Sequence, residues 1–150
     1  MRSTIADGVW PTMITPFTED DALDLEALGP LVEWYLDRGV DGLFAVCQSS
    51  EMFELTLAER VRLAEAVVAR VDRRVGVIAS GHISDDPDEQ VEEVTRIAAT
   101  GVDAVVLVTN RFASAEESDA VWQERLAHFL DRIPDSIPLG HTLASAMVLL

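Results

Sequence analysis

The polar turn at residues 47–51 holds the side chains best suited to chemistry. It reads Cys-Gln-Ser-Ser-Glu and follows the apolar run at residues 42–46, which predicts a buried strand. In parallel α/β folds, ligands bind at the carboxyl ends of the strands. The amide of Gln48 and the hydroxyls of Ser49 and Ser50 are therefore candidates for binding a ligand. The alternative is that the two hydroxyls only bond local backbone, as turn serines often do.

Cys47 and Glu51 lie at the two ends of this turn and are weaker candidates. No histidine stands beside Cys47 in the sequence to activate its thiol, so we expect a small buried side chain there. Glu51 could act as a catalytic acid, but we favour a structural contact with nearby backbone.

A histidine and two acids follow the apolar run at residues 75–79, and together they suggest a metal site. Asp86 stands directly before Pro87, a pattern typical of a helix cap. If Asp86 caps a helix, only His82 and Asp85 remain as ligands, and two ligands are too few to hold a metal ion. We therefore expect no metal site and no other cofactor.

Asn110 and Arg111 follow the apolar run at residues 104–108. An arginine at the end of a strand could hold a substrate carboxylate through paired hydrogen bonds. In so acidic a chain, an ion pair between Arg111 and a nearby acid such as Glu116 is an equal alternative. His128 stands beside Phe129 within a predicted helix, and we expect a structural position for it.

The elements that must position these residues alternate along the chain. The expected strands occupy residues 8–14, 42–46, 75–79 and 104–108, and a fifth begins at 137. The expected helix caps are Asp24, Thr56 with Glu59, Asp86, and Ser114 with Glu117. Pro30 conflicts with an early start of the first helix, so we expect regular helix from about residue 30. The second helix should bury Leu57, Val61, Ala64, Val68 and Val71.

Strict strand–helix alternation with continuous apolar strands predicts a parallel sheet covered by helices. The Gly-Val-Asp sequence at 39–41 returns at 101–103, which indicates βα units of about 31 residues. Two architectures fit: a complete five-strand doubly wound domain that binds a small acid, or about four and a half units of a (β/α)₈ barrel. A doubly wound nucleotide binder should carry a glycine-rich phosphate turn after its first strand, and Thr15-Pro-Phe17 stands there instead.

Composition narrows the function classes. The 150 residues carry a formal net charge of −16, which argues against nucleic acid as a partner. All eleven basic residues are arginine, so the sequence contains no lysine. One cysteine excludes a disulfide framework. We expect no secretory leader and no membrane span, and therefore a cytoplasmic protein.

Several spaced motifs resemble the dihydrodipicolinate synthase and N-acetylneuraminate lyase family. They occur in family order over residues 8–140 and comprise Gly8-Val-Trp-Pro with Thr15-Pro-Phe17, Gly39-Val-Asp-Gly-Leu43, the turn ending in Glu51, Leu55-Thr56 with Glu59-Arg60, Val77-Ile78-Ala79, Gly101-Val-Asp-Ala-Val-Val106 and Ile137-Pro138.

The resemblance implies a (β/α)₈ barrel of the class I aldolase type, here its N-terminal half in residues 1–140. Family members act on pyruvate or a related 2-keto acid through a Schiff-base lysine on the sixth strand, and many are homotetramers built from dimers. The family's turn is usually Gly-Thr-Thr-Gly-Glu or Gly-Ser-Thr-Gly-Glu. Ser49 falls at the second hydroxyl-bearing position of the family's turn. Gln48 replaces the first hydroxyl-bearing residue, and Ser50 replaces the glycine that follows the second. The resemblance therefore implies carboxylate binding by Gln48, Ser49, Ser50 and Arg111, with Ser49 as a proton relay.

Other positions depart from the family. A pair of tyrosines often follows the fourth strand in relatives, and Arg111 and Phe112 stand there. Relatives also use a tyrosine on the fifth strand to transfer protons. It would fall at about Thr142, within a tail at 141–150 that does not resemble the family. The Schiff-base lysine is absent. We therefore expect a truncated or frameshifted chain that is inactive, or else a half-barrel that needs a partner or self-associates.

Overall fold

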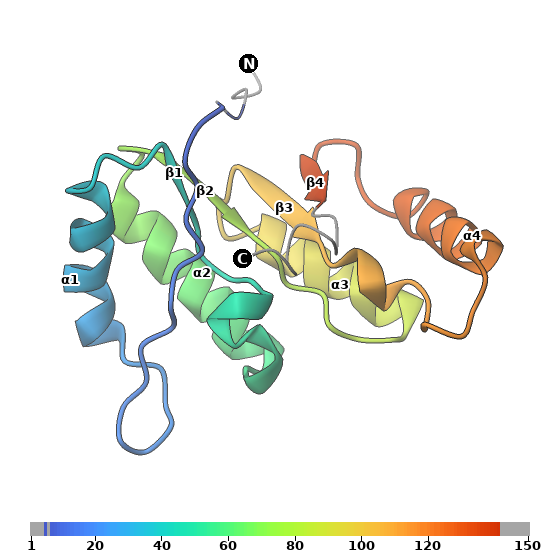
Figure 1. Cartoon of the computed structure of the whole chain (residues 1–150), viewed down its shortest axis with the longest axis horizontal. Helices are drawn as coiled ribbons and strands as arrows, with labels where there is room; N and C mark the ends of the chain where they lie inside the picture. The colour runs from blue at the N-terminus through green and yellow to red at the C-terminus, as the bar shows by residue number, and fades with distance from the viewer. Residues whose placement is uncertain (1–4, 6, 142–150) are drawn as a thin grey trace.

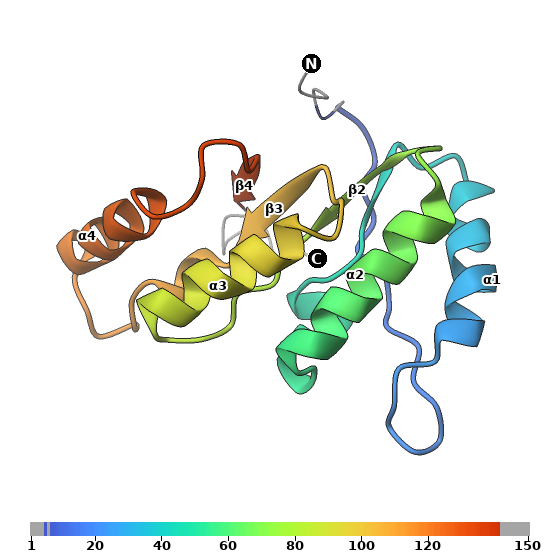
Figure 2. The same ribbon diagram turned by 180° about the vertical axis from the view of Figure 1, so that it is seen from behind.

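The chain folds as a parallel sheet with helices on one face (Figure 1). The computed structural model describes residue 5 and residues 7–141. The strands are β1 (Gly42–Phe44), β2 (Gly76–Ala79), β3 (Ala104–Leu107) and β4 (Leu139–His141), paired in parallel in that order. The helices are α1 (Leu25–Leu36), α2 (Leu57–Val71), α3 (Pro87–Ala98) and α4 (Asp119–Leu130), with short 3₁₀ turns η1 (Gln48–Ser50), η2 (Met52–Glu54) and η3 (Thr109–Arg111). Figure 2 shows α2 and α3 in front of the strands.

The predicted first strand is an extended segment and not a full strand. Thr12 forms a parallel bridge with Phe44, and the backbone N–H of Phe44 donates to the carbonyl oxygen of Pro11 at 3.0 Å. Met13 returns the bond to the carbonyl oxygen of Phe44 at 2.9 Å. Because Pro11 has no N–H to donate, the ladder is confined to a single bridge. The segment nevertheless extends the sheet by one position beyond β1.

Helix α1 begins five residues earlier than the sequence predicts. The Asp24 carboxylate accepts hydrogen bonds from the N–H groups of Glu26 and Ala27, which satisfies donors that the first turn leaves free. Pro30 lies inside the helix, which loses one internal hydrogen bond there and continues to Leu36. The expectation of a start near residue 30 is therefore wrong, because the cap outweighs the missing bond.

Helix α4 begins later than its predicted capping box. The Glu117 carboxylate accepts the N–H of Ser114 at 2.9 Å and is held by the guanidinium of Arg125 at 2.6 Å. These bonds close a turn ahead of the helix, and the helix itself starts after Ser118, whose side chain makes no capping bond. Of the two predicted capping boxes, Thr56 with Glu59 caps a helix, whereas Ser114 with Glu117 closes a turn before one.

The alternation of side chains along the strands separates two apolar layers. Leu43, Val77 and Val105 point toward the helices and belong to the main core, while Phe44, Ile78 and Val106 form a smaller cluster with Cys47. Strand residues one position apart face opposite sides of the sheet, so the smaller cluster lies on the face away from α2 and α3.

Helix α2 buries a face that is rotated from the predicted one, although Ala64 and Val71 are buried as expected. Its buried residues are Arg60, Leu63, Ala64, Val67 and Val71, whereas Val61 and Val68 are only half-buried. The helix contacts α1, α3 and the sheet, so its flanks are also partly covered. Along the described part of the chain, no helix is both long and apolar enough to cross a membrane.

Candidate functional site

The turn after β1 is folded into two short 3₁₀ segments, η1 and η2, joined by Glu51. Glu51 adopts a left-handed conformation with φ of 60°, and its N–H bonds the carbonyl oxygen of Gln48 at 3.3 Å. Its side chain is exposed. Glu51 therefore acts through its backbone, where it reverses the chain between the two segments.

Ser50 faces the core and holds the turn to the N-terminal segment. Its side chain is 1% exposed, and its hydroxyl donates to the carbonyl oxygen of Met13. The Cys47 sulfur lies 3.0 Å from the same hydroxyl, and the Ser50 carbonyl oxygen accepts from the Thr15 hydroxyl at 2.7 Å. In this conformation the Ser50 hydroxyl is occupied by a structural bond. Cys47 is buried, as expected from its surroundings in sequence.

Ser49 faces solvent at the same turn. Its side chain is exposed, and among the described residues it has no hydrogen-bond partner. The two neighbouring serines therefore have opposite environments, and Ser49 is the hydroxyl that a ligand can reach.

The turns after β1 and β3 meet across the end of β2. The side-chain amide of Gln48 donates to the Asn110 side-chain oxygen at 3.4 Å, although 62 positions separate them in sequence. The parallel order of the sheet explains this contact, because carboxyl ends of parallel strands lie at one edge. Gln48, which precedes Ser49 in the chain, and the η3 turn thus lie at one edge of the sheet.

Arg111 belongs to the same edge and pairs with an acid from the β2 loop. Its Nη2 lies 2.8 Å from the Asp85 carboxylate, and its guanidinium stands 6.0 Å from the centre of the Phe53 ring. The Arg111 side chain is 29% exposed and that of Asp85 is 85% exposed, so water and ligands reach this pair. The expected ion pair between Arg111 and an acid is therefore present, but its partner is Asp85 and not Glu116.

Phe112 and His82 lie inside the molecule and not at the site. The His82 ring is fully buried, 5.4 Å from the Phe112 ring and 5.9 Å from the Phe129 ring. Its Nε2 accepts the backbone N–H of Val108 at 2.6 Å. Burial lowers the pKa of His82 from 6.5 to about 4, so the ring is neutral near pH 7.

The three residues considered for a metal site have separate roles. His82 is enclosed by aromatic rings, Asp85 pairs with Arg111, and Asp86 accepts the N–H groups of Asp88 and Glu89 at the start of α3. Asp86 is the cap that the sequence predicts. Within the residues that the structure describes, no three potential metal ligands gather. His128 is exposed on α4, and Thr142 lies outside the described residues.

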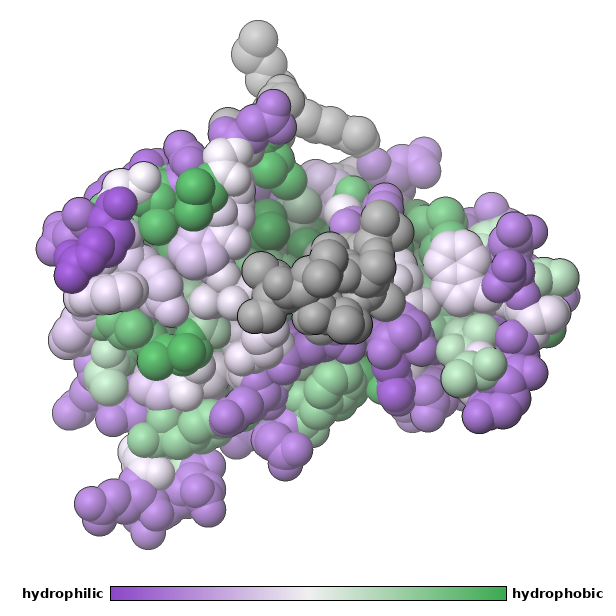
Figure 3. Space-filling model, viewed as in Figure 1, coloured by the Kyte–Doolittle hydropathy of each residue, from purple (hydrophilic) through white to green (hydrophobic). Residues whose placement is uncertain are grey.

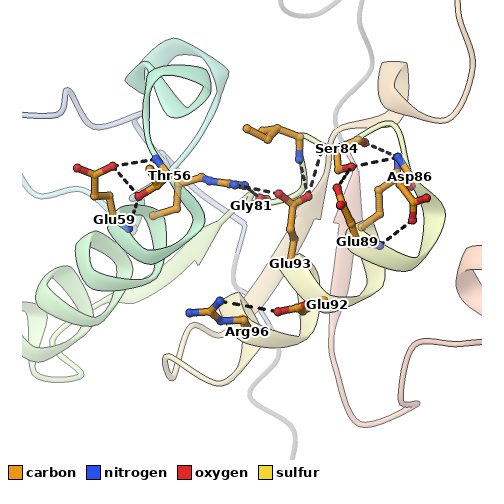
Figure 4. Close-up of polar contacts among 12 residues, drawn as sticks. Thr56, Glu59, Gly81, Ser84, Asp86, Glu89, Glu92, Glu93 and Arg96 are labelled. Carbon is orange, nitrogen blue, oxygen red and sulfur yellow. Dashed lines mark hydrogen bonds and ion pairs between the residues drawn. The ribbon is translucent and has the colours of Figure 1, made fainter.

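A buried polar cluster below the site was not predicted. Arg60 on α2 forms an ion pair with Glu93 on α3 at 2.8 Å, and both side chains are buried beside Gly81 and Ser84 (Figure 4). Gln90, one helical turn before Glu93, is also buried. The sequence did contain a signal for this cluster. Gln90 and Glu93 are three positions apart and share a helix face with the apolar Val94 and Ile97, which indicates that their polar side chains face the core.

The chain is similar to proteins of one family over most of its length. The family model described as the dihydrodipicolinate synthetase family matches residues 6–122. A 4-hydroxy-tetrahydrodipicolinate synthase from Bartonella bacilliformis is 35% identical over 102 residues, which is 68% of this chain and 34% of that protein. The same enzyme from Haloarcula marismortui is 34% identical over 73% of this chain and 35% of its own length. The match thus spans about a third of these curated relatives.

Solved structures agree with these matches. Dihydrodipicolinate synthase DapA-2 from Bacillus anthracis has a TM-score of 0.77 at 28% identity, covering 92% of this chain and 46% of that one. YagE from Escherichia coli K12, a family protein solved in complex with pyruvate, has a TM-score of 0.75 at 26% identity, covering 89% and 43%. The parallel sheet with its helices corresponds to the N-terminal half of the barrel in these enzymes.

Proposed function

This chain belongs to the dihydrodipicolinate synthetase family, and from that membership we propose that the edge formed by the turns after β1 and β3 is half of a 2-keto acid site. Ser49 binds the keto acid carboxylate and stands at the relay position, and Gln48 donates a further hydrogen bond. Arg111 supplies the positive charge. The exposed hydroxyl of Ser49, free of partners among the described residues, is the observation that supports this assignment.

Pyruvate is the ligand class for which relatives give support. The similar protein YagE was solved in complex with pyruvate. A carboxylate of this size matches a serine hydroxyl and an arginine, since charge-assisted hydrogen bonds to a carboxylate are about twice as strong as neutral ones. Ser50 is a structural residue in this proposal, because its hydroxyl already donates to Met13.

The 150-residue chain does not carry out the covalent step of the family. A Schiff base forms when a neutral primary amine attacks the keto carbon and water leaves, and the sequence has no lysine to supply that amine. Arginine stays protonated and cannot replace it. The residues present therefore bind the substrate, and a lyase or synthase reaction of the aldolase type needs a lysine from elsewhere.

Two measurements test this function. Ligand-observed NMR of pyruvate should detect binding to the wild-type chain, and Ser49→Ala should weaken it about tenfold through loss of a charge-assisted bond. Ser136→Ala, an exposed serine before β4, serves as the matched control and should leave binding unchanged. Borohydride reduction with pyruvate, followed by peptide mapping, should give no adduct on an internal side chain. Equal binding by both serine variants, or an internal adduct, contradicts the proposal.

A second proposal concerns assembly: the chain is a half-barrel that self-associates or binds another half. The N-terminal segment pairs only with β1, and β4 pairs only with β3, so both outer positions of the described sheet have a free edge. Val9 and Ile14 on that segment are exposed, and Figure 3 shows green apolar groups on this side of the molecule. Sedimentation velocity across a range of concentrations should show dimers or larger species; a monomer at every concentration contradicts self-association.

The cytoplasmic location stays a prediction. Fractionation of the source cells with an antibody to the chain would check it, and recovery in a membrane or secreted fraction would contradict it.

A further inference from the structure

Three buried polar side chains on α2 and α3 have no role in the candidate site as described so far. They belong to Arg60, Gln90 and Glu93, residues that are each no more than 6% exposed. Burying a charged or polar group costs free energy unless hydrogen bonds replace those to water. The partners of these groups therefore show where that cost is recovered, and most of them lie in the loop at residues 80–86.

The ion pair holds the first part of this loop. Arg60 donates from Nη1 to the carbonyl oxygen of Gly81 and from Nη2 to Glu93 at 2.8 Å. The other carboxylate oxygen of Glu93 accepts the N–H groups of Ile83 at 2.8 Å and Ser84 at 3.2 Å. Figure 4 shows Glu93 reaching from α3 to this loop beside Gly81 and Ser84. Backbone groups of three loop residues are thus fixed by one buried pair.

Gln90 joins this loop to the turn after β3. Its side-chain nitrogen donates to the carbonyl oxygen of Ser84 at 2.7 Å and to the carbonyl oxygen of Arg111 at 3.1 Å. Glu93 and Gln90 are three residues apart and lie on one face of α3. Ser84 is therefore held at its N–H by Glu93 and at its carbonyl by Gln90.

Polar contacts hold Arg111 both at its backbone carbonyl and at its guanidinium. Gln90 bonds its backbone carbonyl, and Asp85, the residue after Ser84, bonds its guanidinium at 2.8 Å. We propose that Gln90 is a positioning residue that aims the guanidinium of Arg111 at the 2-keto acid carboxylate, with Arg60 and Glu93 fixing the loop that carries Asp85. This inference rests on the proposed function for the ligand and for the part that Arg111 takes in binding it.

A purely structural role for Gln90 makes a different prediction. If the residue served only packing, its removal would loosen α3 or the whole molecule. If it positions Arg111, removal loosens two loops that are far apart in sequence and leaves the helices intact. Native-state hydrogen exchange separates these cases, since it reports local opening residue by residue.

The first experiment compares Gln90→Met with Glu92→Met by hydrogen exchange. Methionine keeps the length of glutamine without its donors, and Glu92 is an exposed residue of the same helix. We expect Gln90→Met to raise exchange about tenfold at the amides of Ser84 and Arg111, the change expected from one lost hydrogen bond. The amides of Leu63 and Val67 on α2 should keep their wild-type rates. Uniformly faster exchange, or faster exchange in one loop alone, overturns the inference.

The second experiment is a double-mutant cycle on pyruvate affinity, measured by the same NMR titration. Gln90→Met should weaken binding several-fold in the wild-type background and not at all in an Arg111→Ala background, because it acts through Arg111. Equal losses in both backgrounds overturn the positioning role. If Gln90→Met does not fold, Gln90→Asn, which keeps the amide one methylene further back, replaces it in both experiments.

The outcomes also separate this inference from the proposed function. A wild-type chain that does not bind pyruvate contradicts the proposed function, and the exchange rates at Ser84 and Arg111 still decide whether Gln90 couples the two loops. A wild-type chain that binds pyruvate with an affinity unchanged by Gln90→Met supports the function and overturns the inference.

Discussion

The imidazole of His82 illustrates how a titratable residue can serve packing and not chemistry. The backbone N–H of Val108 donates to its Nε2, so the neutral ring carries its proton on Nδ1. Protonation of Nε2 would break that bond and place a charge between Phe112 and Phe129. Desolvation lowers the pKa to about 4; Glu93 opposes the shift, and Arg111 and Arg60 add to it.

This pKa predicts acid sensitivity in a defined window. The folded-state pKa of about 4 lies below the ordinary 6.5, so the unfolded chain binds the proton first as the pH falls. Stability from the neutral ring is complete above pH 6.5 and is lost progressively down to pH 4. Between pH 7 and pH 5 the loss should be about 2 kcal/mol. Urea unfolding at pH 7, 6 and 5 measures it.

The matched variants are His82→Gln and His128→Gln. His82→Gln keeps an acceptor for Val108 but cannot titrate, so its stability should depend less on pH than that of the wild type over this window. His128 is exposed, and its replacement should leave the wild-type slope unchanged. An unchanged slope in His82→Gln would show that other groups carry the acid sensitivity.

Residue type alone indicated a candidate turn but not which way each of its side chains faces. By residue type Ser49 and Ser50 were equivalent, and the contact of Ser50 with Met13, 37 positions earlier, decides which of them is buried. The partner of Arg111 was missed for the same reason: Asp85 is 26 positions away in sequence and adjacent only across the sheet. Such choices depend on long-range contacts that spacing does not encode.

At the scale of elements, the N-terminal segment is held by the close fit of one aromatic ring. The side chain of Trp10 lies against the glycines that begin β1 and β2. A Cβ atom would stand 2.2 Å from the ring at Gly42 and 2.4 Å at Gly76, well inside contact distance. Both strands therefore begin with glycine because a larger residue would displace Trp10.

Gly42→Ala should separate the N-terminal segment from β1. We expect a loss of about 1–3 kcal/mol in the free energy of unfolding, the usual cost of overpacking. Urea denaturation followed by circular dichroism measures it. Gly140→Ala on β4 is the control, because its Cβ would meet Val106 at an ordinary 3.8 Å. Equal stability of the two variants would refute a tight fit at Trp10.

The order and type of these elements could be predicted, but only some of their ends could, such as the starts of α2 and α3. Strands β1 to β3 fall inside the predicted apolar runs, and β4 begins two residues after the predicted start of the fifth strand, because continuous apolar runs bounded by turns are a local signal. The starts of α1 and α4 were displaced because a cap competes with a proline in one case and with a salt-bridged turn in the other. The cap before α1 therefore fixed the start of a helix, whereas the similar capping pattern before α4 closed only a separate turn.

At the scale of the whole molecule, the large net negative charge is the main electrostatic influence on the stability of the fold. The 27 acidic and eleven basic residues leave a formal net charge of −16 on 150 residues. Six ion pairs occur among the described residues, and most are partly exposed, such as Arg74 with Glu33 at 2.6 Å. Exposed pairs of this kind each contribute about 0–1 kcal/mol. Most carboxylates repel one another without compensation, and a compact chain suffers more from this repulsion than an unfolded one.

Added salt should therefore stabilise the fold. Raising the ionic strength from about 0.01 M to 0.1 M shortens the screening length from about 30 Å to about 10 Å, which weakens repulsion between distant carboxylates more than attraction within contact pairs. We expect the urea midpoint to rise with NaCl over this range at pH 7.5. Sucrose of equal osmolality controls for solute exclusion, which strengthens burial without screening charge. The buried pair of Arg60 and Glu93 is shielded from solvent ions, so Glu93→Gln should lower the midpoint equally at every salt concentration. A midpoint that falls with NaCl would mean that ion pairs, and not net charge, control the stability of this chain.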